Sequence, residues 1–167
     1  MTDRDDKQEL KIRPLHPLIG AEVTNVDFKE PLSESVVKEI HQAWMDYQIL
    51  VFPNQKISDE QHVAVTRNFG EPEIFHQSII KSKFVKEIFR VSNTDEDGRL
   101  MPQSHPIQQQ LSSAKKWHTD SSYRSIPAMG SLLHGVEVSR TGGLTCFTNM
   151  YEVYDALPER LRTRVEV

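Results

Sequence analysis

The most constraining feature of the sequence is a His-Thr-Asp triplet, His118 to Asp120, inside the stretch WHTDSSY. On an extended strand, the side chains of residues i and i+2 leave the same face, so this spacing predicts a strand that presents an imidazole and a carboxylate together. With a second imidazole, these groups form the facial ligand set that holds Fe(II) and leaves coordination positions open. On the triplet alone, a surface strand pair without metal is the favoured interpretation, so the flanking sequence must decide.

A chain of 167 residues is long enough for one domain with a hydrophobic core. Its net charge of -4 and pI near 6.0 provide no basic field, which argues against a nucleic-acid partner. The apolar runs are too short to span a membrane, and the charged N-terminus has no signal-peptide core. The single cysteine, Cys146, cannot form an internal disulfide. Together these observations predict a cytoplasmic protein with no membrane partner.

Two amphipathic segments in the first half of the chain predict helices. In residues 33–47 apolar side chains recur at helical spacing, and Ser33 is the expected N-cap. The second helix begins with a capping box of Ser58 and Gln61. His62 on this helix is interpreted as an exposed polar residue. The apolar side of the second helix is expected to consist of Ala64, Val65 and Phe69.

Short apolar runs predict strands. Residues 49–52, ILVF, are wholly apolar and lead into a turn, which favours a buried strand. A short strand is also expected after HPLIG at residues 16–20, and residues 87–91 have a strand-like pattern. The last part of the chain predicts strands at 129–138 and 144–149, followed by helices at 151–156 and 158–165.

Two details of that last part bear on function. Gly142 and Gly143 suit a turn with positive φ between the two predicted strands. His134 would share a strand face with apolar residues, so a hydrogen-bonded core histidine is the simpler interpretation, ahead of a metal ligand.

Two segments of the chain lack a regular pattern. Residues 1–9 are charged and lack periodicity, which predicts a disordered tail. Residues 92–116 are polar and rich in proline and glutamine, and loops of this length inside a domain are usually functional lids or disordered insertions. We expect a mobile loop at 92–116 that acts as a lid over the His118 region.

When the triplet is considered with its flanking sequence, the chain resembles the taurine and chlorophenoxyacetate (TauD/TfdA) family of Fe(II)- and 2-oxoglutarate-dependent dioxygenases. The resemblance runs from His16 to Arg164, and the SSY after the triplet is closer to the chlorophenoxyacetate branch. It rests on WHTDSSY, IPAMGSLLHGVEVSRTGGLTCFTNMYEVYDALPERLR, HPLIGAEVTNVDF, ILVFPNQ and RNFGEPE.

The resemblance implies an α+β fold that is mainly β: a double-stranded β-helix, or jelly roll, preceded by helices. Residues 10–167 would be the N-terminal part of a single domain of this kind, with the C-terminal strands of the barrel missing.

The resemblance also implies roles for five residues. His118 and Asp120 would bind the iron and serve in catalysis, and Thr145 in GGLT would hydrogen-bond a carboxylate of 2-oxoglutarate. His76 and Asn93 fall where the family contacts its substrates. The implied reaction uses Fe(II), 2-oxoglutarate and O₂ to hydroxylate a small anionic substrate, phenoxyacetate- or sulfonate-like, with release of succinate and CO₂.

The family's third iron ligand, a histidine, and the arginine that pairs with the distal carboxylate of 2-oxoglutarate would lie in a C-terminal stretch that follows these residues. The sequence is therefore expected to be a fragment, a truncated reading frame or a degenerate copy, three alternatives that remain open. Two other classes also remain, a non-catalytic remnant of the fold and a hydrolytic zinc enzyme. The sequence identifies neither the substrate nor the oligomeric state, and a homo-oligomer is left open.

Overall fold

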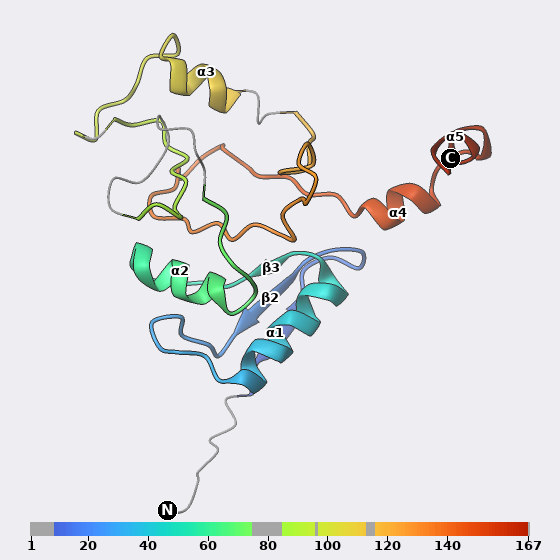
Figure 1. Cartoon of the computed structure of the whole chain (residues 1–167), viewed down its shortest axis with the longest axis horizontal. Helices are drawn as coiled ribbons and strands as arrows, with labels where there is room; N and C mark the ends of the chain where they lie inside the picture. The colour runs from blue at the N-terminus through green and yellow to red at the C-terminus, as the bar shows by residue number, and fades with distance from the viewer. Residues whose placement is uncertain (1–8, 75–84, 96, 113–115, 167) are drawn as a thin grey trace, which may run out of the picture. The chain divides into compact units, whose positions relative to one another are not determined.

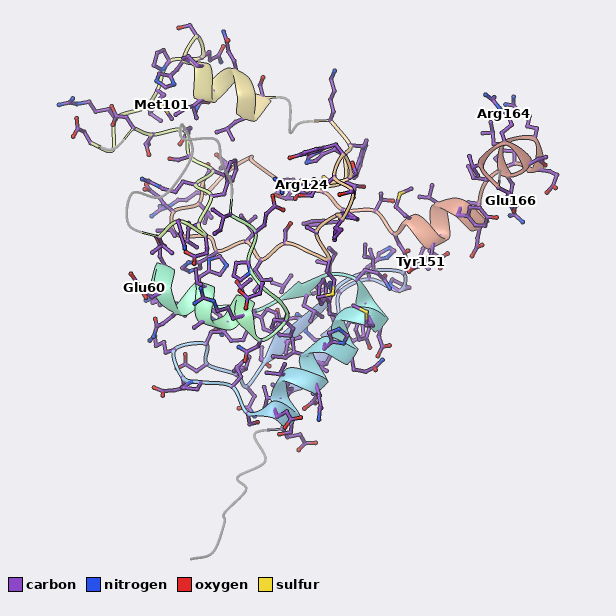
Figure 2. All side chains as sticks on the ribbon, viewed as in Figure 1. Glu60, Met101, Arg124, Tyr151, Arg164 and Glu166 are labelled. Carbon is purple, nitrogen blue, oxygen red and sulfur yellow. The ribbon has the colours of Figure 1, made fainter. Side chains whose placement is uncertain are left out.

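The computed structural model describes residues 9–74, 85–95, 97–112 and 116–166 (Figure 1, with side chains in Figure 2). The chain divides into two compact units, which are described separately. One consists of Met1–Ile57 and Val136–Val167, and the other of Ser58–Gly135. Across the described ranges, no helix combines the length and apolar character needed to cross a membrane.

The first unit is built on a three-stranded sheet with the order β1-β2-β3. The strand β1, Lys11–Pro14, pairs antiparallel with β2, Ala21–Thr24. The strand β2 pairs in parallel with β3, Leu50–Val51. Parallel neighbours need a crossover connection, and the helix α1, Glu34–Tyr47, provides it and contacts β3 (Figure 1). The unit therefore begins as a β-hairpin followed by a β-α-β crossover.

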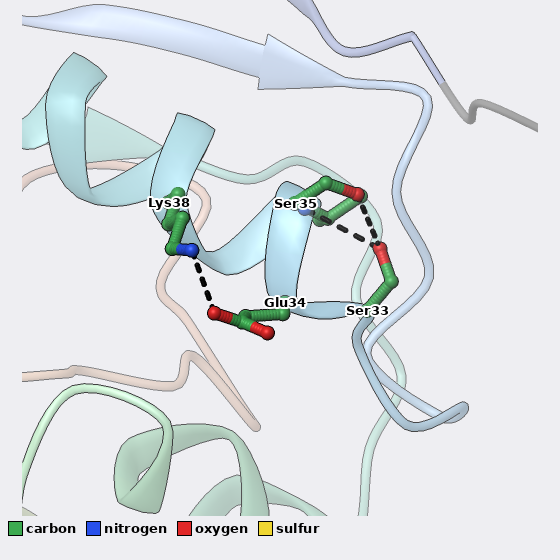
Figure 3. A network of polar contacts seen from close by, with 5 residues as sticks. Ser33, Glu34, Ser35 and Lys38 are labelled. Atoms are coloured by element: carbon green, nitrogen blue, oxygen red, sulfur yellow. Dashed lines mark hydrogen bonds and ion pairs between the residues drawn. The ribbon is translucent and has the colours of Figure 1, made fainter.

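The helix α1 begins at the N-cap that the sequence predicted. The Val36 backbone N–H donates to Ser33 Oγ at 3.3 Å, and Ser33 Oγ also lies 3.0 Å from Ser35 Oγ (Figure 3). One turn further on, Lys38 Nζ donates to Glu34 Oε1 at 2.6 Å. Both side chains of this ion pair are largely exposed, so the pair contributes little to stability. The local capping signal is what fixes the start of this helix.

Along β2, fully buried side chains alternate with partly exposed ones, and the buried ones belong to the core of the first unit. Ala21 and Val23 are fully buried, as the two-residue period of a strand requires when one face meets the interior. The helix α1 buries Val36, Ile40 and Ala43 at helical spacing. Other apolar side chains complete this set, namely Leu10, Val26 and Phe28. The Phe28 ring lies 4.8 Å from the Phe52 ring, centroid to centroid.

The end of the first unit carries two short helices, as predicted. These are α4, Met150–Asp155, and α5, Glu159–Val165. Asn149 caps α4, because its side chain accepts a hydrogen bond from the Tyr151 backbone N–H at 3.0 Å. The Asn149 amide also donates to the Leu18 carbonyl at 2.8 Å and to Gln48 Oε1 at 3.1 Å. One side chain thus links the start of α4 to the β1–β2 connection and to the end of α1.

The second unit contains α2, Asp59–Arg67, and α3, Pro106–Ser112. The capping box predicted for α2 is confirmed, with Gln61 N–H donating to Ser58 Oγ at 3.3 Å and Ser58 N–H donating to Gln61 Oε1 at 2.9 Å. The predicted apolar side is partly wrong: Val63 and Val65 are the buried residues of α2, whereas Ala64 is exposed. The capping signal is local, but the buried face depends on what the helix packs against.

The segment 92–116, expected to be a mobile loop, is not uniformly irregular. It holds α3 and an isolated antiparallel bridge between Thr94 and Leu100. Its mobility and its role as a lid stay predictions, as does the disordered tail at 1–9, of which residues 1–8 lie outside the described part of the chain.

Several predicted strands are wrong. Residues 129–138 and 144–149 have no strand structure, and 87–91 includes no more than a single bridge residue. The predicted buried strand at 49–52 is reduced to Leu50–Val51, and Val51 is 44% exposed. A strand needs a neighbouring strand, and residues 129–138 and 144–149 contain no strand residue, whereas Leu50–Val51 is a strand because it pairs with β2. The mainly-β character is therefore not seen in the described ranges, and the jelly roll stays a prediction.

Candidate metal centre

The structure brings the side chains of His118 and Asp120 together. His118 Nε2 lies 3.3 Å from Asp120 Oδ1, and the two side chains are 50% and 64% exposed. The strand predicted for this stretch is wrong, because residues 117–119 are irregular and a turn begins at Asp120. The convergence of the two groups is nevertheless present. A histidine nitrogen and a carboxylate oxygen side by side, with one side open to solvent, fit the donors that a divalent iron ion accepts.

Each of the two groups is held by a further polar partner. His118 Nδ1 lies 2.7 Å from the Lys116 carbonyl oxygen. A carbonyl oxygen can only accept, so Nδ1 is the donor of this hydrogen bond, and Nε2 is the nitrogen that lies beside Asp120 and would be the one available to a metal ion. The Ser131 hydroxyl donates to Asp120 Oδ2 at 3.1 Å. Such outer hydrogen bonds fix the tautomer and orientation of metal-binding side chains.

The described residues provide these two groups without a third. Among them, no set of three or more His, Cys, Asp or Glu side chains lies close enough together to hold a metal ion. The assignment of His118 and Asp120 as ligands therefore stays a prediction that rests on donor chemistry and geometry.

Thr145, the predicted 2-oxoglutarate contact, lies in the first unit and is exposed. The stretch from Gly143 to Asn149 is irregular, so the strand predicted for it is absent. The positive φ predicted for the two glycines is confirmed, since Gly142 and Gly143 have φ values of 71° and 65°, although the chain bends there without joining two strands. A side chain at either position would be strained, because this left-handed region disfavours residues with a Cβ atom.

The two predicted substrate contacts have different outcomes. His76 lies outside the described residues. Asn93 is exposed, and its carbonyl oxygen accepts a hydrogen bond from the Met101 backbone N–H at 2.8 Å. Its role toward a substrate stays a prediction.

A contact that the sequence did not reveal joins His62 and His134. Their ring centroids are 5.9 Å apart with planes at 71°, an edge-to-face arrangement. Both residues are half-buried, so the prediction of an exposed His62 is wrong, and His134 does not lie on a strand. Burial lowers the pKa of the His62 imidazole, and the His134 ring lowers it further, against the opposing effects of the Leu132 backbone and Asp59. The half-buried His62 imidazole is therefore harder to protonate than an exposed one.

Because the pKa of His62 is lowered in the folded protein, we expect the free energy of unfolding to fall as the pH drops below about 6.5, the ordinary pKa of histidine. Above that pH His62 is neutral in both states and contributes nothing. Below it, the unfolded chain takes up the proton first, because the folded pKa is lowered, and unfolding is favoured. His62→Gln should make this pH dependence weaker, as measured by urea denaturation between pH 7.5 and 5.

The control is His41→Gln, at an exposed histidine of α1, which should leave the pH dependence as it is in the parent. A parent-like slope in His62→Gln, or an equal reduction in His41→Gln, would contradict the assignment.

Comparison with known proteins gives a consistent picture. The family model described as "Taurine catabolism dioxygenase TauD, TfdA family" matches residues 11–167. The "Alpha-ketoglutarate-dependent 2,4-dichlorophenoxyacetate dioxygenase" of Cupriavidus pinatubonensis is 34% identical over 157 residues, covering 92% of this chain and 54% of the relative. The "(S)-phenoxypropionate/alpha-ketoglutarate-dioxygenase" of Sphingobium herbicidovorans is also 34% identical, covering 93% and 50%.

A solved structure, "AAD-2 in complex with Mn(II) and N-oxalylglycine", is similar with a TM-score of 0.77 and 30% sequence identity. The similarity covers 95% of this chain and 53% of that one. The chain thus spans about half the length of the curated relatives it matches.

Proposed function

Because the chain belongs to the taurine catabolism dioxygenase TauD, TfdA family, we propose that it carries the first two iron ligands of an Fe(II)- and 2-oxoglutarate-dependent dioxygenase. The observation that carries this proposal is the 3.3 Å approach of His118 Nε2 to Asp120 Oδ1. Two donors of this kind, with an open side, are two of the three protein ligands in the facial arrangement that leaves positions free for cosubstrate and O₂.

The residues of the site would act by holding and orienting. His118 would offer its Nε2 lone pair, because Nδ1 is engaged in donating a hydrogen bond to the Lys116 carbonyl oxygen. Asp120 would offer Oδ1, while Oδ2 accepts from Ser131. Iron bound there would supply the oxidative chemistry of the family, in which O₂, 2-oxoglutarate and a substrate C–H bond yield succinate, CO₂ and the hydroxylated substrate. The protein's part is to fix the ligand geometry and leave part of the coordination sphere open.

The proposed substrate is a small organic anion of the phenoxyacetate type. The support is the printed names of two relatives, one a 2,4-dichlorophenoxyacetate dioxygenase and one a (S)-phenoxypropionate dioxygenase. His76 and Asn93 are the candidate contacts to this substrate. A sulfonate is the competing substrate class. The fold that we propose with this function is the jelly roll of the family.

The test adds Fe(II) and then 2-oxoglutarate to the purified chain without oxygen. Chelation of iron by the 2-oxo acid produces a visible charge-transfer band, which is expected for the parent and absent for His118→Ala. A zinc hydrolase or a remnant without an iron site would give no band in the parent. Iron-dependent release of succinate, assayed with phenoxyacetates and with sulfonates, then separates a catalytic protein from a non-catalytic remnant and identifies the substrate class.

Thr145→Val is expected to weaken the binding of 2-oxoglutarate by about tenfold to a hundredfold, because a hydrogen bond to a charged group contributes about 1.5–3 kcal/mol. Valine keeps the β-branched shape and removes the hydroxyl donor. The measurement is a titration of the charge-transfer band with 2-oxoglutarate.

Thr148→Val, another exposed threonine of the same irregular stretch, is the matched control and should bind 2-oxoglutarate as the parent does. Parent-like binding by Thr145→Val would reject the proposed contact.

A further inference from the structure

The turn that follows Asp120 contains a strained residue. Ser121 has a φ of 55°, which places a non-glycine residue in the left-handed region. The turn closes when the Arg124 backbone N–H donates to the Ser121 carbonyl at 3.1 Å. A left-handed residue of this kind is strained and persists only where its surroundings hold it. Asp120 is bonded directly to Ser121, so the backbone of the candidate ligand depends on this turn.

One carboxylate contacts both ends of that turn. Glu73, which follows α2, accepts a hydrogen bond from Ser121 Oγ to its Oε2 at 3.2 Å. Its other oxygen, Oε1, is shielded from solvent and forms an ion pair with the Arg124 guanidinium (Arg124 is labelled in Figure 2). The Arg124 guanidinium also lies 5.7 Å from the centroid of the Tyr123 ring. Glu73 therefore bridges residues 121 and 124 across the turn.

The contacts of Glu73 with Ser121 and Arg124 are expected to restrain the chain more strongly than an ordinary surface ion pair does. The Glu73 and Arg124 side chains are 29% and 34% exposed, so water screens their attraction less than it screens the open pairs of α1. Both bonds of Glu73 restrain the same short turn. Releasing them allows Ser121 to leave its left-handed conformation, and that rotation would carry the Asp120 carboxylate away from His118.

We propose that Glu73 is a positioning residue for the metal centre, acting through the Ser121–Arg124 turn to hold the Asp120 carboxylate beside His118 Nε2. This inference rests on the proposed function of His118 and Asp120 as iron ligands. Glu73 itself does not touch the metal in this assignment, and its role is to set the geometry of a ligand.

The experiment measures the affinity of the chain for Mn(II), in the presence of N-oxalylglycine, from the electron paramagnetic resonance signal of the free ion. Glu73→Ala is expected to weaken Mn(II) binding by about tenfold to a hundredfold, the range found when outer partners of metal ligands are removed. Glu73→Gln keeps the shape and an acceptor for Ser121 but loses the ion pair, so a smaller loss is expected. Melting temperatures are recorded for every variant.

Glu87→Ala is the matched control, because Glu87 forms an ion pair with Arg67 in the same unit, at 3.1 Å, away from the turn. It should bind Mn(II) as the parent does. Unchanged affinity in both Glu73 variants, beside a parent whose Mn(II) binding is lost in His118→Ala, would overturn the inference and leave the proposed function standing.

An equal loss in Glu87→Ala would overturn the inference too, since it would reveal general destabilisation. A parent that binds no Mn(II) through His118 would overturn the proposed function and, with it, the role of Glu73.

Discussion

His118→Ala is expected to abolish iron binding, and Asp120→Ala should do the same. Each change removes one of two neighbouring donors, and a single imidazole or carboxylate cannot retain a labile divalent ion. The loss should exceed the ten- to hundredfold effect of removing an outer partner. Asp120→Glu keeps the carboxylate but displaces it, so it should lose less than the alanine variant. The measurement is the iron content after anaerobic reconstitution and desalting.

The control for these variants is His105→Ala, since His105 belongs to the same unit and its Nδ1 accepts a hydrogen bond from the Ile107 backbone N–H at 3.3 Å. This histidine is not assigned to the metal, and its removal should leave the iron content at the parent value. Iron stoichiometry that stays unchanged in His118→Ala or Asp120→Ala would reject the metal centre.

The largest expected effect on stability is that of Ile40→Ala. Ile40 is 3% exposed at the middle of the buried face of α1. Truncation of a buried isoleucine to alanine costs about 2–5 kcal/mol, through lost transfer free energy and the cavity left behind. Against a total free energy of unfolding of about 5–15 kcal/mol for a typical domain, such a loss is large. Urea denaturation followed by circular dichroism measures it.

Glu39→Ala is the comparison, one residue away on the exposed side of the same helix. Surface changes of this kind usually stay within about 0.5 kcal/mol. An Ile40→Ala variant as stable as Glu39→Ala would show that the face of α1 containing Ile40 is not part of a core.

Local signals explain which parts of the fold could be predicted. The N-cap at Ser33 and the capping box at Ser58 depend on residues within one turn, so the sequence alone located the starts of α1 and α2. The strand β1 had no such signal. Its residues, Lys-Ile-Arg-Pro, have no apolar run, and it is a strand because its backbone pairs with β2. Strand formation depends on a partner that sequence patterns do not identify.

The same reason accounts for the false strands. Leu133, Val136 and Leu144 are 76%, 82% and 89% exposed, although their pattern of apolar and β-branched residues is typical of strands. In the described residues these segments have no neighbouring strand, and propensity without a neighbour does not produce a sheet. The strands were predicted from the pattern of side chains, whereas strand formation depends on backbone hydrogen bonds to a neighbouring strand.

The candidate site was predictable to the extent that it is local. The one-residue spacing of His118 and Asp120 was enough to predict their convergence, even though the backbone between them is not a strand. Glu73 and the pair of His62 and His134 escaped prediction, because their contacts join segments far apart in the chain. A carboxylate that follows a helix has no feature that identifies its distant partner.

The three-stranded sheet has two unlike edges. On β1, Pro14 lacks a backbone N–H, and Lys11 and Arg13 are exposed charged residues. Proline and positive charge are common means by which proteins prevent another strand from joining at an edge. The opposite edge, β3, is short and carries the exposed apolar side chain of Val51. The β1 edge therefore carries features that resist the addition of another strand, whereas the two residues of β3 carry neither proline nor charge.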